Sequence, residues 1–420
     1  MAIVVIALVV LVAVAVLGGA HWYVWRRLVR DTTRAWGPVR LVGTAVFVVG
    51  PVLMIAALVT ERGGAPFWLQ RVLGWPGFLW MALLIYLLLA VLVGEVVRPL
   101  LRRFVERRGR PETAVADKPS PDKPSPDEPS LDEPSPEEPS PQPLAVPSRR
   151  LFVSRVVGGA AAAAAVGTVG YGTYGVLRGP SVKRITVPLA KLPRSAHGFR
   201  IAVVSDIHLG PVLGRGFAQR VVDTINSTQP DLIAVVGDLV DGSVKNLGPA
   251  AAPLAQLRAR HGSFFVTGNH EYFSGAEQWL EEVRTLGIHP LENARTELSW
   301  FDLAGVNDLQ GESEGQGPDF GKALGDRDTT RACVLLAHQP VQIHEAVKHN
   351  VDLQLSGHTH GGQLWPGNFI AAAANPTVAG LERYGDTELY VSRGAGAWGP
   401  PTRVGAPSDI TVVELASTHA

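Results

Sequence analysis

The sequence has very little cysteine and no net charge, and each absence excludes a class of protein. A single cysteine, Cys333, occurs among 420 residues. No disulfide can therefore form within the chain, and cysteine usage does not separate the cytoplasm from an oxidising compartment. We expect Cys333 to fill apolar space in a buried strand. Basic and acidic residues number 38 each, which excludes a general nucleic-acid binder with a basic surface. Chemistry on phosphate would therefore depend on bound cations.

Charged residues are also missing from three long stretches near the N-terminus. Residues 2–24, 41–60 and 72–94 contain no Asp, Glu, Lys or Arg, and each is close to the roughly 20 residues that cross a bilayer core. The pattern predicts three transmembrane helices within residues 1–97, with the lipid bilayer as a partner. The first stretch lacks a charged leading region and two more follow, so we expect an anchor rather than a cleaved signal.

The arginines between these stretches predict an orientation. They are dense between residues 26 and 40 and again between 98 and 110, whereas the loop between the second and third stretches has only Arg62 and Arg71. Basic loops are retained in the cytoplasm. We therefore expect the N-terminus outside.

Residues 98–147 contain a basic stretch and then a repeat of proline, serine and acidic residues. The five-residue repeat runs from 117 to 141 and has almost no apolar side chains, so it cannot bury a core. We expect a cytoplasmic, solvated spacer that is stiffened by polyproline geometry. A phosphorylated or partner-binding linker is the alternative.

Residues 148–178 combine a basic motif with an uncharged segment. Ser148, Arg149, Arg150, Leu151 and Phe152 precede the Ala- and Gly-rich residues 156–177. The motif resembles a twin-arginine export signal, which would make the twin-arginine export machinery a partner; a chance pair of arginines in a basic loop is the alternative. A fourth span here would place the rest of the chain outside. If the glycines make the segment too polar to cross, the rest faces the cytoplasm.

Residues 179–420 change to short β-branched runs that alternate with amphipathic stretches. The predicted strands are 200–204, 232–236, 263–266, 333–336, 353–355 and 389–391, and the predicted helices are 216–225 and 276–286. Strands that alternate with helices favour an α/β domain. About 220 residues suffice for one core.

Polar side chains follow five of these strands where each strand ends. They are Asp206, His208, Asp238, Asp241, Asn269, His270, His338, His358 and His360. Each pair alone is typical of a turn. Because ligand sites form at strand carboxyl ends in α/β sheets, the ordered set indicates one shared site.

The residue types in this set suit divalent cations. Carboxylate, imidazole and amide groups bind Mn²⁺, Zn²⁺ or Fe²⁺, whereas a cysteine-rich set would indicate structural zinc. Seven of the side chains are candidate ligands, and one carboxylate can bridge. Two cations about 3.5 to 4 Å apart clamp the attacking and leaving oxygens of a phosphoryl displacement.

The order of the motifs resembles that of the calcineurin-like metallophosphoesterase superfamily. The motifs are Asp-x-His, Gly-Asp-x-x-Asp, Gly-Asn-His-Glu, a lone His and Gly-His-x-His. The resemblance covers about residues 200–415. The ending at 357–363, with the twin-arginine-like segment, is similar to a bacterial membrane-associated or exported phosphodiesterase branch. The fold it implies is a sandwich of two β-sheets flanked by helices, an α/β catalytic domain over 179–420 that follows the transmembrane helices.

The resemblance also implies roles for the site residues. One cation would be bound by Asp206, His208 and His360, the other by Asn269, His338 and His358, and Asp238 would bridge both. A bridging hydroxide would be the nucleophile. His270 would protonate the leaving oxygen or stabilise the phosphoryl group, and Asp241 would orient His270. No role follows for Glu271.

Two further features bear on the substrate. Protein serine/threonine phosphatases of this superfamily carry an arginine directly after the second Asp of Gly-Asp-x-x-Asp, but Gly242 stands here, which argues against a phosphoprotein. Trp365, Phe369 and Trp398 would either line a substrate entrance or pack in the core. The glycine-rich residues 394–399 would form a loop near the site.

The sequence thus predicts a hydrolase: a membrane-anchored metallophosphoesterase with two divalent ions, manganese among the candidates. We expect a phosphodiesterase with an extracytoplasmic catalytic domain that acts on a lipid-linked or cell-envelope phosphate ester. The same chemistry on a cytoplasmic nucleotide or phospholipid precursor is one alternative. A non-catalytic metal-binding sensor is the other.

Overall fold

The computed structural model describes residues 2–35, 37–108 and 149–419. Most of the spacer predicted for residues 98–147, and Ser148 of the twin-arginine-like motif, lie outside the described residues. The chain divides into two compact units, one formed by residues 1–44 and 87–163 and the other by residues 45–86 and 164–420.

The N-terminal part is helical, as predicted. Its elements are α1 (Ala2–Trp25) with the π-helical turn η1 (Arg26–Arg30), α2 (Pro38–Arg62), α3 (Phe67–Arg108) and α4 (Arg149–Leu177). Within the described residues, four helical segments are long and apolar enough to cross a membrane, with mean hydropathies of 2.1, 2.5, 2.5 and 1.5 in chain order. The lowest value belongs to α4, whose glycines and alanines weaken its apolar character, yet α4 meets the length and composition that a span requires.

Small residues and ion pairs join these helices within each unit. In one unit, Gly77 of α3 lies so close to Leu53 and Ala57 of α2 that no side chain fits there, a close approach typical of membrane helices. In the other unit, Arg27 donates to Glu95 at 2.7 Å. A charge in an apolar helix is costly unless it is paired, and this pair joins η1 to α3.

The rest of the chain is an α/β domain with two six-stranded sheets. The first has the order β1-β12-β2-β3-β4-β5. Its strands are β1 (Ser181–Leu189), β2 (Phe199–Val204), β3 (Leu232–Val236), β4 (Ser263–Val266), β5 (His289–Pro290) and β12 (Asp409–Ser417). Strands β2 to β5 are parallel, and β12 runs antiparallel to β2.

The second sheet has the order β10-β11-β9-β8-β7-β6. Its strands are β6 (Ala294–Glu297), β7 (Phe301–Gly305), β8 (Ala332–Leu336), β9 (Leu353–Ser356), β10 (Gly380–Tyr384) and β11 (Thr387–Val391). The inner four strands are parallel, and β6 and β10 pair antiparallel at the edges. All six strands predicted from the sequence are present in the two sheets.

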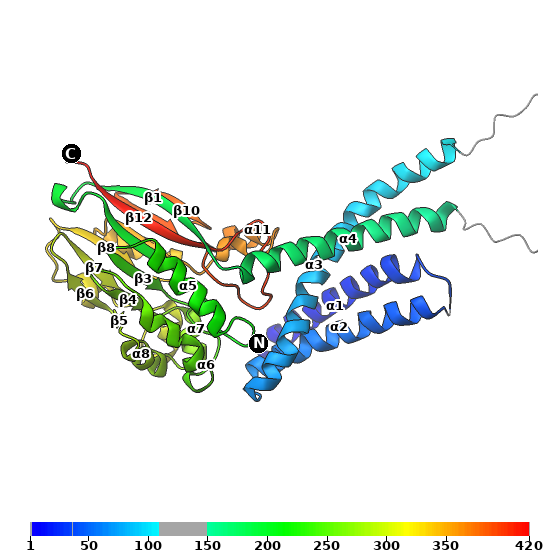
Figure 1. Cartoon of the computed structure of the whole chain (residues 1–420), viewed down its shortest axis with the longest axis horizontal. Helices are drawn as coiled ribbons and strands as arrows, with labels where there is room; N and C mark the ends of the chain where they lie inside the picture. The colour runs from blue at the N-terminus through cyan, green and yellow to red at the C-terminus, as the bar shows by residue number, and fades with distance from the viewer. Residues whose placement is uncertain (1, 36, 109–148, 420) are drawn as a thin grey trace, which may run out of the picture. The chain divides into compact units, whose positions relative to one another are not determined.

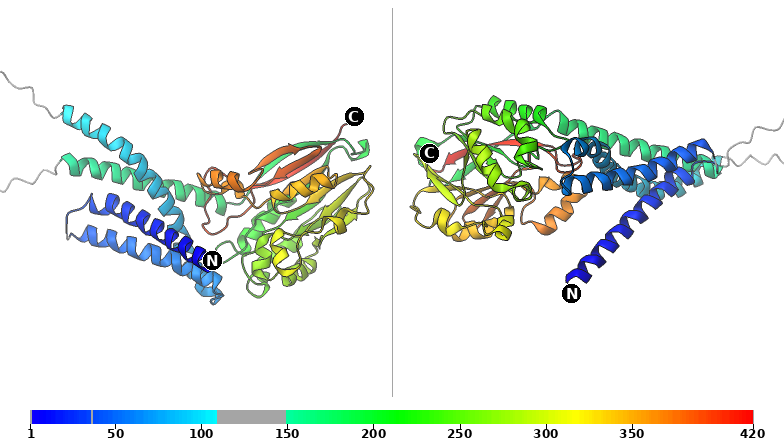
Figure 2. Two further views of the ribbon diagram at one scale, coloured as in Figure 1. Left: turned by 180° about the vertical axis from the view of Figure 1, so that it is seen from behind. Right: turned by 90° about the horizontal axis from the view of Figure 1, so that it is seen from below.

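The two sheets pack face to face, and helices cover both outer faces (Figures 1 and 2). Because side chains alternate along a strand, Ile201 and Val203 of β2 point into the core between the sheets, whereas Ala202 and Val204 point to the outer face. That face is covered by α5 (Arg215–Ser227), α6 (Val244–Ala251) and α8 (Ala276–Thr285). Helices α9 (Phe320–Leu324) and α10 (Ile343–Lys348) cover the second sheet, where Cys333 is fully buried, as predicted.

Candidate metal centre

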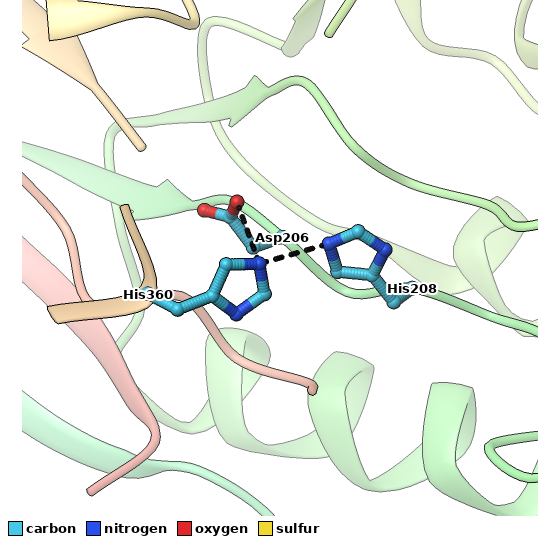
Figure 3. Close-up of side chains that lie close together, drawn as sticks. All are labelled: Asp206, His208 and His360. Atoms are coloured by element: carbon cyan, nitrogen blue, oxygen red, sulfur yellow. Dashed lines mark hydrogen bonds and ion pairs between the residues drawn. The ribbon is translucent and has the colours of Figure 1, made fainter. Parts of the chain in front are cut away.

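The first cluster of donor atoms joins loops after β2 and β9. His208 Nε2 lies 3.0 Å from His360 Nε2, and Asp206 Oδ1 lies 3.3 Å from the same His360 atom (Figure 3). All three side chains are buried. Two imidazole nitrogens and a carboxylate oxygen that converge on one point could hold a divalent cation.

The second cluster lies beside the first and shares Asp238 with it. Asp238 Oδ2 is 3.1 Å from His338 Nε2 and 3.6 Å from His208 Nε2, so this carboxylate faces both clusters. His358 Nδ1 lies 3.0 Å from Asn269 Oδ1. Asp238, His338 and His358 form a second group that could hold a cation. The structure therefore brings all seven predicted ligands into two adjacent sets.

The hydrogen bonds of the histidines fit bound cations. His338 Nδ1 donates to the carbonyl oxygen of Val236 at 2.9 Å, and His208 Nδ1 donates to Asp241 Oδ1 at 2.9 Å. In the neutral form, each ring then presents Nε2 as the atom that can bind a cation. His338 Nε2 is fully buried and lies 3.1 Å from Asp238 Oδ2. A cation held between these two atoms would be bound by both, and the hydrogen bond at Nδ1 orients the ring for it.

The backbone at the site is strained at five of the predicted residues. Asp206, His208, Asp238, His358 and His360 all have positive φ values, between 48° and 73°. This left-handed region is unfavourable for residues with a side chain. Such strain persists where the surrounding structure enforces it and gathers at functional sites.

Close backbone approach explains two glycines of the motifs. Gly237 has a φ of 73°, and a Cβ there would lie 2.5 Å from His338 Nδ1. A Cβ at Gly357 would overlap Ser205 and Asp206. Glycine at these positions lets the strand-end loops of the two sheets meet.

Asp241 connects the first cluster to His270. Its Oδ1 lies 2.6 Å from His270 Nδ1 and 2.9 Å from His208 Nδ1. The contact with His270 is the one that the predicted orienting role requires. The contact with His208 was not expected from the sequence, and it fixes the tautomer of a candidate ligand.

These contacts set the protonation of the site. Burial opposes the charge on His270, but the hydrogen bond and the charge of Asp241 raise the pKa of His270 to about 9. Burial also opposes the charge on Asp241, but His208 and His270 lower the pKa of Asp241 to about 2. Burial and the neighbouring His338 lower the pKa of His358 to about 4. At neutral pH, His270 therefore carries a proton, whereas His358 is the neutral imidazole that metal binding requires.

Glu271 organises the backbone of two loops. Its buried carboxylate accepts hydrogen bonds from the backbone N–H groups of Gly268, Asp238 and Leu239, at 2.6 to 3.0 Å. It thereby ties the start of α7 (Asn269–Ser274) to the loop after β3. Gly268 lies three residues before Glu271, in the Gly-Asn-His motif, but Asp238 and Leu239 lie 33 and 32 residues away in sequence and gave no signal.

Arg403 supports His360 from the C-terminal part of the chain. The buried guanidinium donates from Nη1 to the carbonyl oxygen of His360 at 3.0 Å and from Nε to that of Gly396 at 2.6 Å. Gly396 lies in the predicted glycine-rich loop, where Ala395 N donates to the carbonyl oxygen of Ser205 at 2.9 Å. The loop thus lies at the site, whereas Arg403 belongs to no motif and was missed.

The other histidines lie away from the centre. His261 packs against Phe199, His289 against Phe264, and His349 stacks on Phe320. Trp365, Phe369 and Trp398 are not core residues, because they are 50%, 67% and 46% exposed. The ring of Trp398 lies 5.7 Å from that of His270, so an aromatic side chain borders the site.

Comparison with known proteins agrees with this geometry. Residues 199–362 match the family model described as calcineurin-like phosphoesterase, a range that contains every predicted ligand. The chain is 37% identical to a metallophosphoesterase of Aquifex aeolicus, over 56% of this chain and 91% of that protein. It is 31% identical to the metallophosphoesterase YkuE of Bacillus subtilis, over 65% of this chain and 99% of that protein. The chain belongs to the metallophosphoesterase family.

A second kind of relative also contains a membrane part. A transmembrane protein with metallophosphoesterase domain from Danio rerio is 41% identical over 58% of this chain and 59% of its own length. A protein of the same name from Bos taurus is 39% identical over 56% and 57%. The chain thus matches less than two thirds of these relatives.

Proposed function

We propose that this chain is a membrane-anchored phosphodiesterase that uses two divalent cations to hydrolyse a lipid-linked or cell-envelope phosphate ester. The observation that carries the proposal is the pair of donor sets that share Asp238, with protonated His270 at their edge. Family membership supports the reaction class. Degenerate ligands would favour a non-catalytic sensor, and none of the seven is degenerate.

The chain's own residues divide the work of binding and proton transfer. Asp206, His208 and His360 would hold one cation, and Asn269, His338 and His358 the other, with Asp238 between them. When bound, the two cations supply charge for the phosphoryl oxygens and activate water for attack. Mn²⁺, Zn²⁺ and Fe²⁺ all suit this mixture of oxygen and nitrogen donors.

His270 would donate a proton to the leaving oxygen. Its Nδ1 is held by Asp241, which leaves Nε2 as the donor, and its raised pKa keeps it protonated at neutral pH. A proton donor near the leaving oxygen accelerates the loss of an alkoxide more than that of a stable anion, because an alkoxide is a poor leaving group without a proton. This favours ester substrates with alcohol leaving groups, as in a lipid or polyol diester.

The helices support a membrane location with the catalytic domain outside the cytoplasm. An apolar helix precedes the α/β domain directly, and the arginine-rich ends of the helices predict which side is cytoplasmic. Four crossings would carry the catalytic domain outward. Translocation through the twin-arginine machinery rests on residues 148–152 alone.

The test is hydrolysis by the full chain in detergent after loading with Mn²⁺. A chromogenic phosphodiester and a phosphomonoester are compared, with His358→Ala as the control and a chelator as a second control. We expect chelator-sensitive diester cleavage that His358→Ala abolishes. Turnover of neither substrate, with metal bound, would contradict the proposal and favour the sensor.

A further inference from the structure

The surface beside the metal centre carries a helix whose large apolar side chains the domain leaves exposed. Helix α11 (Gly367–Ala374) has the sequence Gly-Asn-Phe-Ile-Ala-Ala-Ala-Ala, without a charged residue, and none of its residues is buried. Phe369 is 67% exposed and Ile370 is 77% exposed. A contiguous exposed apolar surface of this kind marks a site that contacts a partner or a membrane.

Three exposed aromatic side chains extend this surface to the site. Trp365 precedes α11, while Phe273 and Trp398 place their rings 5.6 and 5.7 Å from the ring of His270. We name the five side chains together the apolar rim: Phe273, Trp365, Phe369, Ile370 and Trp398. Tryptophan is enriched where a protein meets the interface of a bilayer.

The apolar rim is held rigidly to the metal loops. Gln363 follows the last metal motif, and its side chain donates from Nε2 to the carbonyl oxygen of Trp398 at 2.9 Å and accepts from Trp398 N at 3.0 Å. The start of α11 packs on Gly362 so closely that a side chain at 362 would overlap Asn368. A surface that binds the rim would therefore also fix the distance between that surface and the metal centre.

The chain itself brings this surface close to a membrane. Helix α4 ends at Leu177 and β1 begins at Ser181, so the connection spans at most about 14 Å. Near its end, α4 contacts the loop that follows Trp398: Thr173 hydrogen-bonds to Thr402 at 2.7 Å, and Arg403 N donates to the carbonyl oxygen of Gly172. A membrane-length helix thus ends beside the rim.

A second contact within the same compact unit agrees with this placement. Tyr86 of α3 donates its hydroxyl to the carbonyl oxygen of Trp365 at 2.9 Å. Helix α3 is another of the segments with membrane length and composition. Helix α3 therefore contacts the rim at Trp365, and α4 contacts the loop that follows Trp398.

We propose that the apolar rim inserts into the interface of the bilayer to which α4 leads, so that the metal centre receives phosphate esters of lipids from the membrane plane. The inference rests on the proposed phosphodiesterase activity and deepens it, because it names the substrate class. Apolar tails would remain in the bilayer beside α11. The headgroup phosphate would reach the two cations past Trp398 and His270.

Insertion is measured first, without any assay of activity. Ile370→Cys is spin-labelled in the full chain in nanodiscs, where native Cys333 is fully buried, and Asp326→Cys on an exposed loop is the control. We expect the label at 370 to be relaxed by oxygen more than by a water-soluble nickel chelate, with the reverse at 326. Equal access at both positions would overturn insertion. Protection of 370 from both reagents would also overturn it and point to a protein cover, such as a second copy.

The substrate class is tested with two diesters that share one leaving group. Oleyl 4-nitrophenyl phosphate is placed in proteoliposomes with the full chain, and ethyl 4-nitrophenyl phosphate is offered in water. We expect Phe369→Ser with Ile370→Ser to lower kcat/KM at least about tenfold on the oleyl ester and to leave the ethyl ester unchanged. Val347→Ser, an exposed apolar position on α10, is the matched control.

The outcomes separate the inference from the function on which it rests. Equal loss on both esters, or loss on neither, would overturn the rim as a lipid-access surface while diester hydrolysis stands. Hydrolysis of neither ester by the unaltered, metal-loaded chain would instead contradict the proposed function, and the spin label would still report whether the rim inserts.

Discussion

Apolar side chains are used in opposite ways in the two parts of the molecule. In the α/β domain, Ile201, Ile233 and Val334 are fully buried between or behind sheets. In the N-terminal helices, Leu8 is 60% exposed and Val42 is 66% exposed, as expected where lipid rather than protein surrounds them. In the α/β domain the shape and identity of a side chain decide its fit, whereas at lipid-facing positions of the helices apolar character alone would suffice. Helix α11 departs from this division, because it exposes apolar residues within the α/β domain.

We expect the largest loss of activity from substitution of Asp238, where the chemical identity of the side chain matters most. Asp238→Asn keeps the shape but removes the charge that faces both donor sets. We expect kcat to fall at least about 10⁴-fold, the scale of losing a central catalytic group. Metal analysis by mass spectrometry should show fewer than two cations per chain. Retention of both cations with high activity would show that Asp238 does not bridge.

His270 should matter for proton transfer but not for metal binding. His270→Gln removes the proton donor while leaving all seven candidate ligands in place. We expect kcat for the diester to fall by about 10²- to 10⁴-fold with unchanged metal content. An ester with a far more acidic leaving group needs less protonation, so its kcat should fall less. An equal fall in kcat for both esters would argue against His270 as the acid.

Asp241 should act through the pKa of His270. The protonated form of His270 exists below its pKa of about 9, so turnover should decline as the pH rises through that value. Asp241→Asn removes the charge that raises this pKa, and burial then lowers it, so the alkaline decline should move to lower pH. We expect a loss of about 10- to 100-fold in turnover, measured as pH profiles of kcat/KM. The same variant in a His270→Gln background should show no such shift, and an unmoved profile would contradict the coupling.

Different sequence patterns predicted the fold in the two regions. Absence of charge over long stretches predicted α1 to α3, and β-branched runs predicted strands such as β3 and β8 in the sheet interiors. Strand β1 was not predicted, because it lies at a sheet edge with Lys183 and Arg184 on it and is largely exposed. Its partner β12 lies more than 200 residues later, and no local pattern encodes that pairing.

The sequence predicted the candidate ligands of the site but not the residues that hold those ligands in place. Asp, His and Asn after successive strands were visible in the sequence because the motifs are local. The contacts of Arg403, and those of Glu271 with Asp238 and Leu239, were not visible, because they depend on the fold. Helix α11 also escaped prediction: its composition resembles a buried segment, and only the structure shows that Phe369 and Ile370 are exposed.

The smallest effects should come from matched substitutions that compare the two regions directly. Ile233→Ala creates a cavity beneath β3 and should lower the local free energy of unfolding by about 2 to 5 kcal/mol. Val42→Ala in α2 removes methyl groups from an exposed position and should change stability by less than about 0.5 kcal/mol. Hydrogen exchange of peptides from β2 to β4 and from α2, with the full chain in nanodiscs, measures both. A loss at Val42 as large as that at Ile233 would mean that protein rather than lipid covers this helix face, and the division between the two regions would not hold there.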